Sequence, residues 1–246
     1  MKEKSNVGNN VPDPPTLLEQ TGLRPAAQPR PVMLQEKMAL SISPNYTSEK
    51  LENPSIEDKI DVFEDRMKGW LFAPMKKLLD EPHDRIASLC LQTTYFEGIW
   101  SYLVGKKSQG RSKEFFINGF YDVFKITQQN EGLLKRAAQI LYEDVRCGFF
   151  HDGIFRDRIF FVDRGFALEI TVPKKNGILN VEGKIQSIMI DPRLFYDAIE
   201  KHFDRYIKLI RNKENQDARK NFETTYAARL GKERIIGIDA PPGFAT

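Results

Sequence analysis

The feature that most constrains this chain is a long amphipathic pattern in residues 131–153, EGLLKRAAQILYEDVRCGFFHDG. Apolar side chains recur there every three to four residues, at Leu133, Leu134, Ala137, Ile140, Leu141, Val145 and Phe149. This spacing places them on one face of an α-helix, and that face must be buried against other elements. The pattern therefore predicts a helix over about 131–150 within a helical domain. Arg146 interrupts its apolar face, and His151 follows at its end.

Composition limits the class of protein. The chain has 246 residues, of which 41% are hydrophobic and 29% charged, enough for one domain with appendages. The net charge of +3 permits a nucleic-acid partner without requiring one. Two cysteines without CxxC spacing and three histidines indicate neither a disulfide framework nor a zinc site, and we expect no cofactor. Without a signal sequence or an apolar run long enough for a membrane span, we expect a cytoplasmic protein.

The two ends of the chain differ from its middle. Residues 1–54 include PDPP and RPAAQPRP, a proline density that blocks helices and sheets, so we expect a disordered or extended tail. This tail is either a docking arm or a disordered leader. The domain is expected over 55–234, and 235–246 form a C-terminal tail.

Local signals set the helix boundaries. Ser55 is followed by acidic residues, which predicts a helix start, and this helix should run to Leu79 with a bend near Pro74. Asp191 before Pro192 predicts another start. Further helices are expected at about 84–104, 113–124, 131–150 and 192–211.

Between the last two of these helices the apolar period changes to two. Residues 158–162 and 166–172 look like strands joined by a turn at Asp163-Arg164-Gly165, and 178–181 and 184–190 look like a second hairpin joined at Glu182-Gly183. We therefore expect a mostly α protein, an antiparallel helical bundle with a small antiparallel β-hairpin sheet inserted at about 157–190.

Arg146 and His151 form the segment that indicates a reaction. RNA contains its own nucleophile, the 2′-hydroxyl. A histidine can exchange protons near neutral pH, and an arginine binds phosphate through two N–H groups. The pair would cleave RNA without a metal, with His151 as general acid or base and Arg146 holding the phosphate. The products would be a 2′,3′-cyclic phosphate and a 5′-hydroxyl.

Geometry limits this hypothesis. On a straight α-helix, five residues at about 100° each place Arg146 and His151 roughly 140° apart. The two side chains can share a site if the helix bends or ends at Gly148. Alternatively, the arginine of one subunit faces the histidine of another across a two-fold axis.

A structural interpretation of the same residues stays open. Arg146 would cap the last helical carbonyl groups and pair with Glu143 or Asp144, and His151 would be a helix-terminal residue favoured by the helix dipole. Glu97, in the helix at 84–104, either supports the site or is a solvated residue.

Other segments favour ordinary structural roles. The loop Lys106–Arg111 has a phosphate-binding composition but is not a P-loop. The phenylalanines of Phe115–Phe124 are expected in the core. His202 is expected on the exposed side of its helix, and His83 at a helix start. The basic residues of Lys201–Lys220 form a solvated face or gather RNA phosphates.

A helical domain with Arg-x4-His near the end of a helix, here in LYEDVRCGFFHDG, resembles the HEPN superfamily. The resemblance covers about residues 84–211, with the β segment as an insertion. It implies an α-helical bundle that forms a homodimer, and a metal-independent endoribonuclease of bacterial defence or toxin–antitoxin systems, controlled by a partner protein. Arg146 and His151 would be catalytic, with Glu97 and Asp152 in support.

The chain departs from familiar members of the superfamily at two positions. Cys147 follows the arginine where a polar residue is frequent, and Gly153 stands where some toxins have tyrosine. Other members of the superfamily are inactive interaction modules, so a non-catalytic dimerisation or partner-binding module is the alternative. A second alternative is a nucleic-acid-binding protein without catalysis, which uses Arg205, Lys208 and Arg211.

Overall fold

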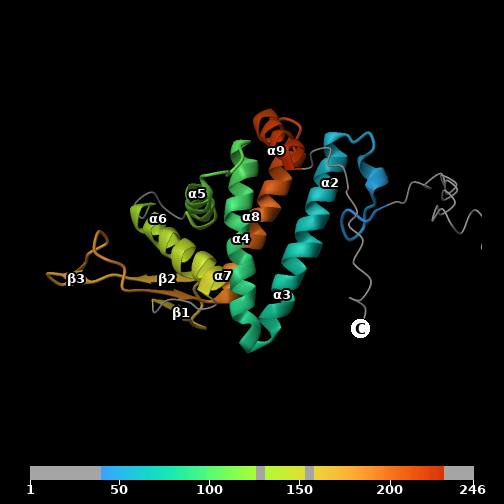
Figure 1. The fold of residues 1–246 in the computed structure, drawn as a ribbon. Helices are drawn as coiled ribbons and strands as arrows, with labels where there is room; N and C mark the ends of the chain where they lie inside the picture. Colours follow the sequence, from blue (N-terminus) through green and yellow to red (C-terminus); the bar gives the residue numbers. More distant parts are fainter. Residues whose placement is uncertain (1–39, 126–130, 153–157, 230–246) are drawn as a thin grey trace, which may run out of the picture. The chain divides into compact units, whose positions relative to one another are not determined.

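The structure is a computed structural model that describes residues 40–125, 131–152 and 158–229. It is mostly helical with a small sheet, as the sequence predicts (Figure 1). The α-helices are α2 (Ile56–Arg66), α3 (Ala73–Asp80), α4 (Arg85–Val104), α5 (Ser112–Phe124), α6 (Glu131–Ile140), α7 (Gly148–Asp152), α8 (Pro192–Arg211) and α9 (Gln216–Arg229). Shorter 3-10 or π segments are η1 (Ser48–Leu51), η2 (Met67–Phe72), η3 (Pro82–Asp84) and η5 (Leu141–Cys147).

Within the described part of the chain, every helix is too short or too polar to cross a bilayer.

Two helix starts are built as the sequence predicts. The Ser55 hydroxyl accepts a hydrogen bond from the backbone N–H of Asp58, whose carboxylate accepts one from the N–H of Ser55. At α8, the Asp191 carboxylate accepts hydrogen bonds from the N–H groups of Arg193 and Leu194. Because these side chains satisfy N–H groups that have no partner inside the helix, both helices begin at the expected residues.

The first long helix runs from Ile56 to Asp80 as α2, η2 and α3. A bend was expected near Pro74, and the irregular segment is the π-helical η2, just before it. There the N–H of Ala73 bonds to the carbonyl of Lys68, five residues back. Proline has no N–H to donate, so helical hydrogen bonding is already weakened at this point.

Helix α4 lies at the centre of the bundle, between the α2–α3 run and α5 (Figure 1). It contacts α3, α5, α8, α9 and η5, and its apolar residues are spread around the helix instead of forming one stripe. It ends at Gly105, which has a left-handed φ of 67° that glycine adopts without strain.

The core between α4, α5 and α8 is aromatic. Phe96 of α4 contacts the rings of Phe116, Phe120 and Phe195, with centroids 5.2, 5.3 and 5.8 Å away. Each of these four side chains is fully buried. The phenylalanines of α5 are therefore core residues, as expected, and they join the helices through edge-to-face and tilted contacts.

The sheet differs from the predicted hairpins. The strands are β1 (Ile159–Phe161), β2 (Leu168–Thr171), β3 (Lys174–Lys175), β4 (Ile178–Leu179) and β5 (Ser187–Ile190). Their order is β1-β5-β2, in which β5 pairs parallel with β1 and antiparallel with β2, so the sheet is mixed. The turn 163–165 therefore joins two strands that do not pair, and the predicted first hairpin is wrong.

Burial explains this order. Ile188 and Ile190 of β5 are fully buried, whereas Phe160 and Phe161 of β1 are exposed. The strand with the most buried side chains takes the centre of the sheet, and this tertiary preference overrides the local turn signal.

The second predicted hairpin, 178–181 with 184–190, is also wrong. Instead β4 pairs antiparallel with β3 across Asn176-Gly177. Both of these residues have positive φ, 53° and 81°, as a two-residue hairpin turn with Asn-Gly requires. The β3–β4 hairpin leaves Ile178 and Leu179 exposed.

Residues 40–54 lie against α2, although the sequence analysis assigned 1–54 to a tail. The Asn45 backbone N–H donates to the Asp65 carboxylate at 2.8 Å, and the Lys50 ammonium lies 2.6 Å from Asp58. Residues 1–39 and the expected tail at 235–246 lie outside the described residues.

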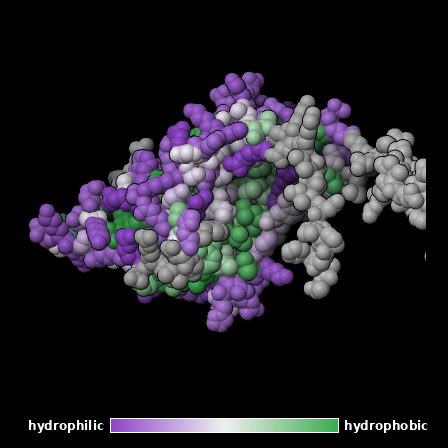
Figure 2. Space-filling model, in the orientation of Figure 1, coloured by the Kyte–Doolittle hydropathy of each residue, from purple (hydrophilic) through white to green (hydrophobic). Residues whose placement is uncertain are grey.

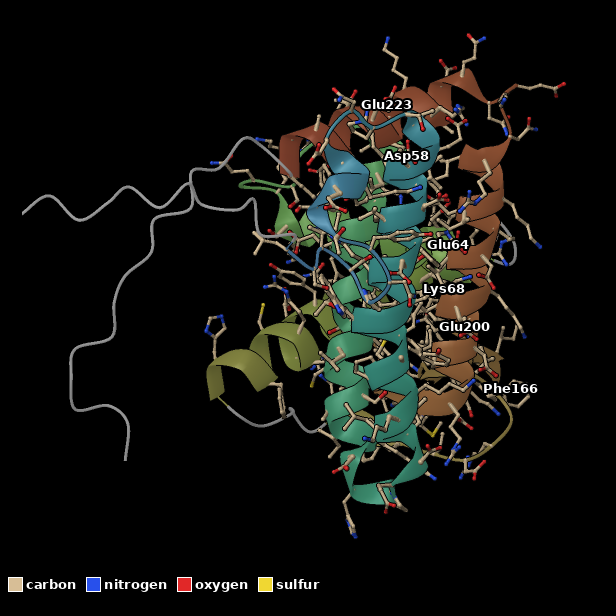
Figure 3. The ribbon with its side chains drawn as sticks, turned by 90° about the vertical axis from the view of Figure 1, so that its right-hand side faces the viewer. Asp58, Glu64, Lys68, Phe166, Glu200 and Glu223 are labelled. Atoms are coloured by element: carbon tan, nitrogen blue, oxygen red, sulfur yellow. The ribbon has the colours of Figure 1, made fainter. Side chains whose placement is uncertain are left out.

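Ion pairs join the outer faces of α2, η2, α8 and α9. Lys68 lies 2.7 Å from Glu64 and 3.3 Å from Asp204, and Lys59 lies 2.8 Å from Glu223. Figure 3 views this face, with Glu64 and Lys68 one turn apart beside α8. These exposed pairs contribute little free energy individually, about 0–1 kcal/mol each.

The contact between α4 and α5 depends on Gly119, because a Cβ there would overlap the backbone carbonyl of Phe96. We expect Gly119→Ala to lower the free energy of unfolding by about 1–3 kcal/mol, since backbone must move to make room. The matched control is Gly98→Ala on α4, where a Cβ meets no atom within 4 Å. That variant should gain up to about 1 kcal/mol from helix propensity. Urea unfolding followed by circular dichroism measures both, and equal stability of Gly119→Ala and wild type would contradict the packing.

Candidate functional site

Arg146 lies in η5, a π-helical segment between α6 and α7. For a shared site the sequence predicts a bend or a helix end at Gly148, but Gly148 has ordinary helical angles, φ −56° and ψ −49°. The distortion therefore precedes the glycine. A π segment inserts an extra residue into the turn and so rotates the side chains after it relative to those before it. Such segments are frequent at functional sites.

Arg146 contacts α4 instead of its own helix end. Its Nη2 lies 3.3 Å from Oε2 of Glu97, and its guanidinium carbon lies 5.3 Å from the ring centroid of Tyr142. The expected structural pairing with Glu143 or Asp144 is therefore wrong. About a third of the side chain, 34%, is exposed, so one ion pair does not remove the guanidinium from solvent.

Glu97 is held in place by two groups. Its Oε2 faces Arg146, and its Oε1 accepts a hydrogen bond of 2.7 Å from the hydroxyl of Ser108. Ser108 belongs to the loop that follows α4, a segment that the sequence analysis treated as an ordinary surface loop. Because the carboxylate is held through both of its oxygens, Glu97 can orient Arg146. The two residues are 49 positions apart in the sequence.

His151 lies on α7 and is exposed. Its side chain has no hydrogen-bond partner among the residues that the structure describes. The side chain of Asp152, the other predicted supporting residue, lies outside the described residues.

One pocket brings three of the predicted residues together. This pocket, here called the Arg–His pocket, has a volume of about 390 Å³ and is lined by Thr94, Glu97, Gly98, Arg146, His151 and Arg229. Its walls come from α4, η5, α7 and the end of α9. Arg146 and His151 therefore line one pocket of one chain.

Sequence reasoning missed Arg229, Thr94 and Gly98. Arg229 ends α9 and forms no ion pair with any described residue. No local signal identifies it, because its place in the pocket depends on how α9 packs on α4.

The chemistry available in the Arg–His pocket is that of an anion site beside a proton-transfer group. Arg146 and Arg229 supply guanidinium groups, which bind phosphate or carboxylate through paired N–H donors. His151 supplies an imidazole that can exchange protons. Tyr142 borders the site, and burial raises the pKa of its phenol, so it stays neutral.

A larger open cavity, about 590 Å³, lies at the start of α5 beside the loop Lys106–Arg111. Its cations are already paired. Arg111 donates to Glu114 at 2.8 Å, and Lys113 lies 2.7 Å from Glu143. Although this cavity is larger, its cations already have carboxylate partners. The Arg–His pocket is therefore the better candidate for binding an anion.

The basic face of α8 is partly neutralised. Arg211 lies 2.9 Å from Asp61 and 2.7 Å from Glu64, whereas Arg205 and Lys208 are exposed. Arg205, Lys208 and Arg211 are the residues expected to bind phosphates in a nucleic-acid-binding protein. Among the described contacts, Arg211 is already paired with two carboxylates.

His202 is buried, which corrects the expectation of an exposed histidine. Its Nδ1 lies 2.8 Å from the hydroxyl of Tyr95 and its Nε2 lies 2.8 Å from Oδ2 of Asp122. Burial would raise the pKa of Asp122, but hydrogen bonds from His202 and Lys125 lower it to about 2. This network joins α4, α5 and α8, and we assign it a structural role.

Comparison of the chain with family models, with curated proteins and with solved structures gives no match. Among residues 40–125, 131–152 and 158–229, no three His, Cys, Asp or Glu side chains are grouped so that they could hold a metal ion.

The Asp122 network predicts an acid-dependent stability. The pKa of Asp122 falls from 3.8 to about 2 on folding. The ionised carboxylate therefore contributes fully to the free energy of unfolding above pH 3.8, and this contribution is lost as the pH falls through the folded-state pKa of about 2. When the pH falls from about 5 to about 2, the free energy of unfolding of wild type should decrease by roughly 2 kcal/mol more than that of Asp122→Asn. Urea unfolding across this range measures it, with Asp80→Asn, at an exposed aspartate, as the control. A constant difference between wild type and Asp122→Asn would contradict the assigned pKa.

Proposed function

We propose that this chain is a metal-independent endoribonuclease of the HEPN type. The observation that best supports the proposal is that Arg146, Glu97 and His151 line one open pocket of one chain. The resemblance to the superfamily connects Arg146 and His151 by their spacing along the sequence, and the pocket connects them in space. The helical bundle around the pocket is consistent with this proposal.

The proposed reaction follows from the groups in the pocket. The 2′-oxygen of a ribose attacks the adjacent phosphorus, and the bond from phosphorus to the 5′-oxygen breaks. His151 either removes the proton of the 2′-hydroxyl or donates a proton to the leaving 5′-oxygen, and water completes the other transfer. The products are a 2′,3′-cyclic phosphate and a 5′-hydroxyl.

Arg146 has the electrostatic role. Negative charge grows on the non-bridging phosphate oxygens in the transition state, and a guanidinium already positioned there lowers the barrier. Glu97 positions Arg146 through their 3.3 Å contact, and Ser108 in turn holds Glu97. Arg229, which also lines the pocket, adds a second positive charge for the RNA backbone.

The biological setting is proposed from the resemblance. It places the protein in the cytoplasm, in a bacterial defence or toxin–antitoxin system, as a homodimer that a partner protein controls. Two features remain different from familiar members, namely Cys147 after the arginine and glycine at position 153.

A second candidate function is a non-catalytic module that binds a partner. The observation that favours it is the ion pair between Glu97 and Arg146, which partly neutralises the guanidinium before any phosphate arrives. In this case His151 would be an exposed residue without a catalytic role.

The two candidates predict different results with mixed cellular RNA in EDTA. If the chain is an endoribonuclease, wild type cleaves and leaves 2′,3′-cyclic phosphate ends, whereas His151→Ala and Arg146→Ala are each slower by about 100-fold or more. The control His83→Ala removes an exposed histidine of η3 and should cleave like wild type. Gel analysis and end mapping measure the rates and products. Absence of cleavage by folded wild type would favour the binding module, and full activity of His151→Ala would exclude the proposed mechanism.

A further inference from the structure

A second cavity adjoins the Arg–His pocket. It has a volume of about 370 Å³ and shares Thr94, Gly98 and Arg229 with that pocket. We call it the aromatic cavity. Thr94 and Gly98 are one turn apart on the same face of α4, so the two cavities meet along this strip. The space-filling view shows a hollow with apolar side chains between α4 and the α2–α3 run (Figure 2).

The walls of the aromatic cavity are mostly apolar. They include Phe63, Met67, Leu71, Tyr95, Ile99 and Tyr102. Its volume lies in the range of small-ligand sites, about 300–1,000 Å³. Aromatic and thioether side chains suit a flat ring, which packs against them by stacking or edge contacts.

The lining of this cavity also includes the polar side chains Tyr226, Arg229 and Arg66. Tyr226 is 5% exposed, and its buried hydroxyl has no hydrogen-bond partner among the described residues. Arg229 lies over the ring of Tyr102 at 5.2 Å and is exposed. Arg66 is already bound to the carbonyl of Ile42. The cavity thus contains the Tyr226 hydroxyl, which is buried without a partner among the described residues, and it shares with the Arg–His pocket the guanidinium of Arg229, which forms no ion pair with a described residue.

Gly98 lines both cavities. A Cβ built on Gly98 meets no atom within 4 Å, so the space beside it is empty. A glycine in the middle of a helix is unfavourable relative to alanine. A larger side chain at this position would project into the strip that the two cavities share.

We infer that the aromatic cavity receives the nucleobase next to the phosphate held by Arg146, and that Arg229 binds the RNA backbone between them. The inference rests on the proposed function, since it assigns Arg146 a phosphate. A nucleobase is flat and apolar on its faces, and its edge has donors and acceptors that can meet the hydroxyl of Tyr226. The cavity would therefore set which base precedes or follows the cleaved bond.

The test fills or alters the cavity while Arg146 and His151 stay unsubstituted. Because Gly98 lines both cavities and Tyr226 lines only the aromatic cavity, Tyr226→Phe separates an effect on the aromatic cavity from one on the Arg–His pocket. Gly98→Val places a branched side chain in the shared strip, and Gly132→Val is the matched control, because Gly132 is an exposed helical glycine of α6 that lines neither cavity. Tyr226→Phe removes only the hydroxyl and keeps the buried ring, so it stays informative if Gly98→Val fails to fold.

Two readouts separate the inference from the proposed function. The first is the base preference at mapped cleavage sites in RNA. The second is binding of 2′-O-methyl dinucleotides of every base combination, measured by calorimetry, because these lack the attacking hydroxyl and cannot be cleaved. We expect Gly98→Val to weaken binding by about tenfold or more and to flatten the base preference. Tyr226→Phe should change the preference, and Gly132→Val should match wild type.

The outcomes are distinct. Cleavage with an unchanged base preference in Gly98→Val and Tyr226→Phe would overturn the inference and leave the nuclease proposal intact. Absence of cleavage together with dinucleotide binding that both Gly98→Val and Tyr226→Phe weaken would support the aromatic cavity as a nucleotide site while the nuclease proposal fails. Dinucleotide binding that is absent from wild type, or equal in wild type and Gly98→Val, would overturn the inference.

Discussion

Burial of α4 on most of its circumference is the constraint on which the rest of the structure depends. A helix packed on so many sides must satisfy its polar side chains internally, because an unsatisfied buried polar group costs about 1–3 kcal/mol. The Gln92 amide nitrogen donates to Ser88 and to the carbonyl of Pro192, and Ser88 donates to the carbonyl of Met75, whereas Oε1 of Gln92 has no partner among the described residues. The strip Thr94–Gly98 includes the positions of α4 that reach the Arg–His pocket. The core thus fixes where on α4 a ligand can approach.

The π segment η5 links this core to the site. Leu141 and Val145 of η5 are fully buried, and Arg146 follows directly, half-buried and turned toward α4. The buried residues hold the segment in place, while its irregular hydrogen bonding changes the angle between Arg146 and the residues of α7. A straight α-helix would place Arg146 and His151 on different faces. The segment Leu141–Cys147 departs from α-helical geometry directly before α7, and both side chains line one pocket of one chain.

Much of the helical layout is predictable from the sequence, because caps and periodicity are local. Ser55 and Asp191 begin their helices as predicted, since each satisfies N–H groups within its own first turn. The strand pairing was wrong because burial of Ile188, a non-local effect, decides which strand is central. His202 was misplaced for a similar reason, since its partners Tyr95 and Asp122 come from other helices. Of the site, the Arg146–His151 pair follows from the sequence, whereas the Glu97 contact with Ser108 and the approach of Arg229 arise only from packing.

In the proposed function one chain supplies both Arg146 and His151, and the most direct measurement mixes two variants that are expected to be inactive. Arg146→Ala and His151→Ala proteins are unfolded together, refolded so that any subunits exchange, and assayed for RNA cleavage. Because Arg146 and His151 line the same pocket of one chain, we expect the mixture to stay as inactive as each variant alone. Recovery of cleavage would contradict this, since it would require the arginine of one subunit to act with the histidine of another.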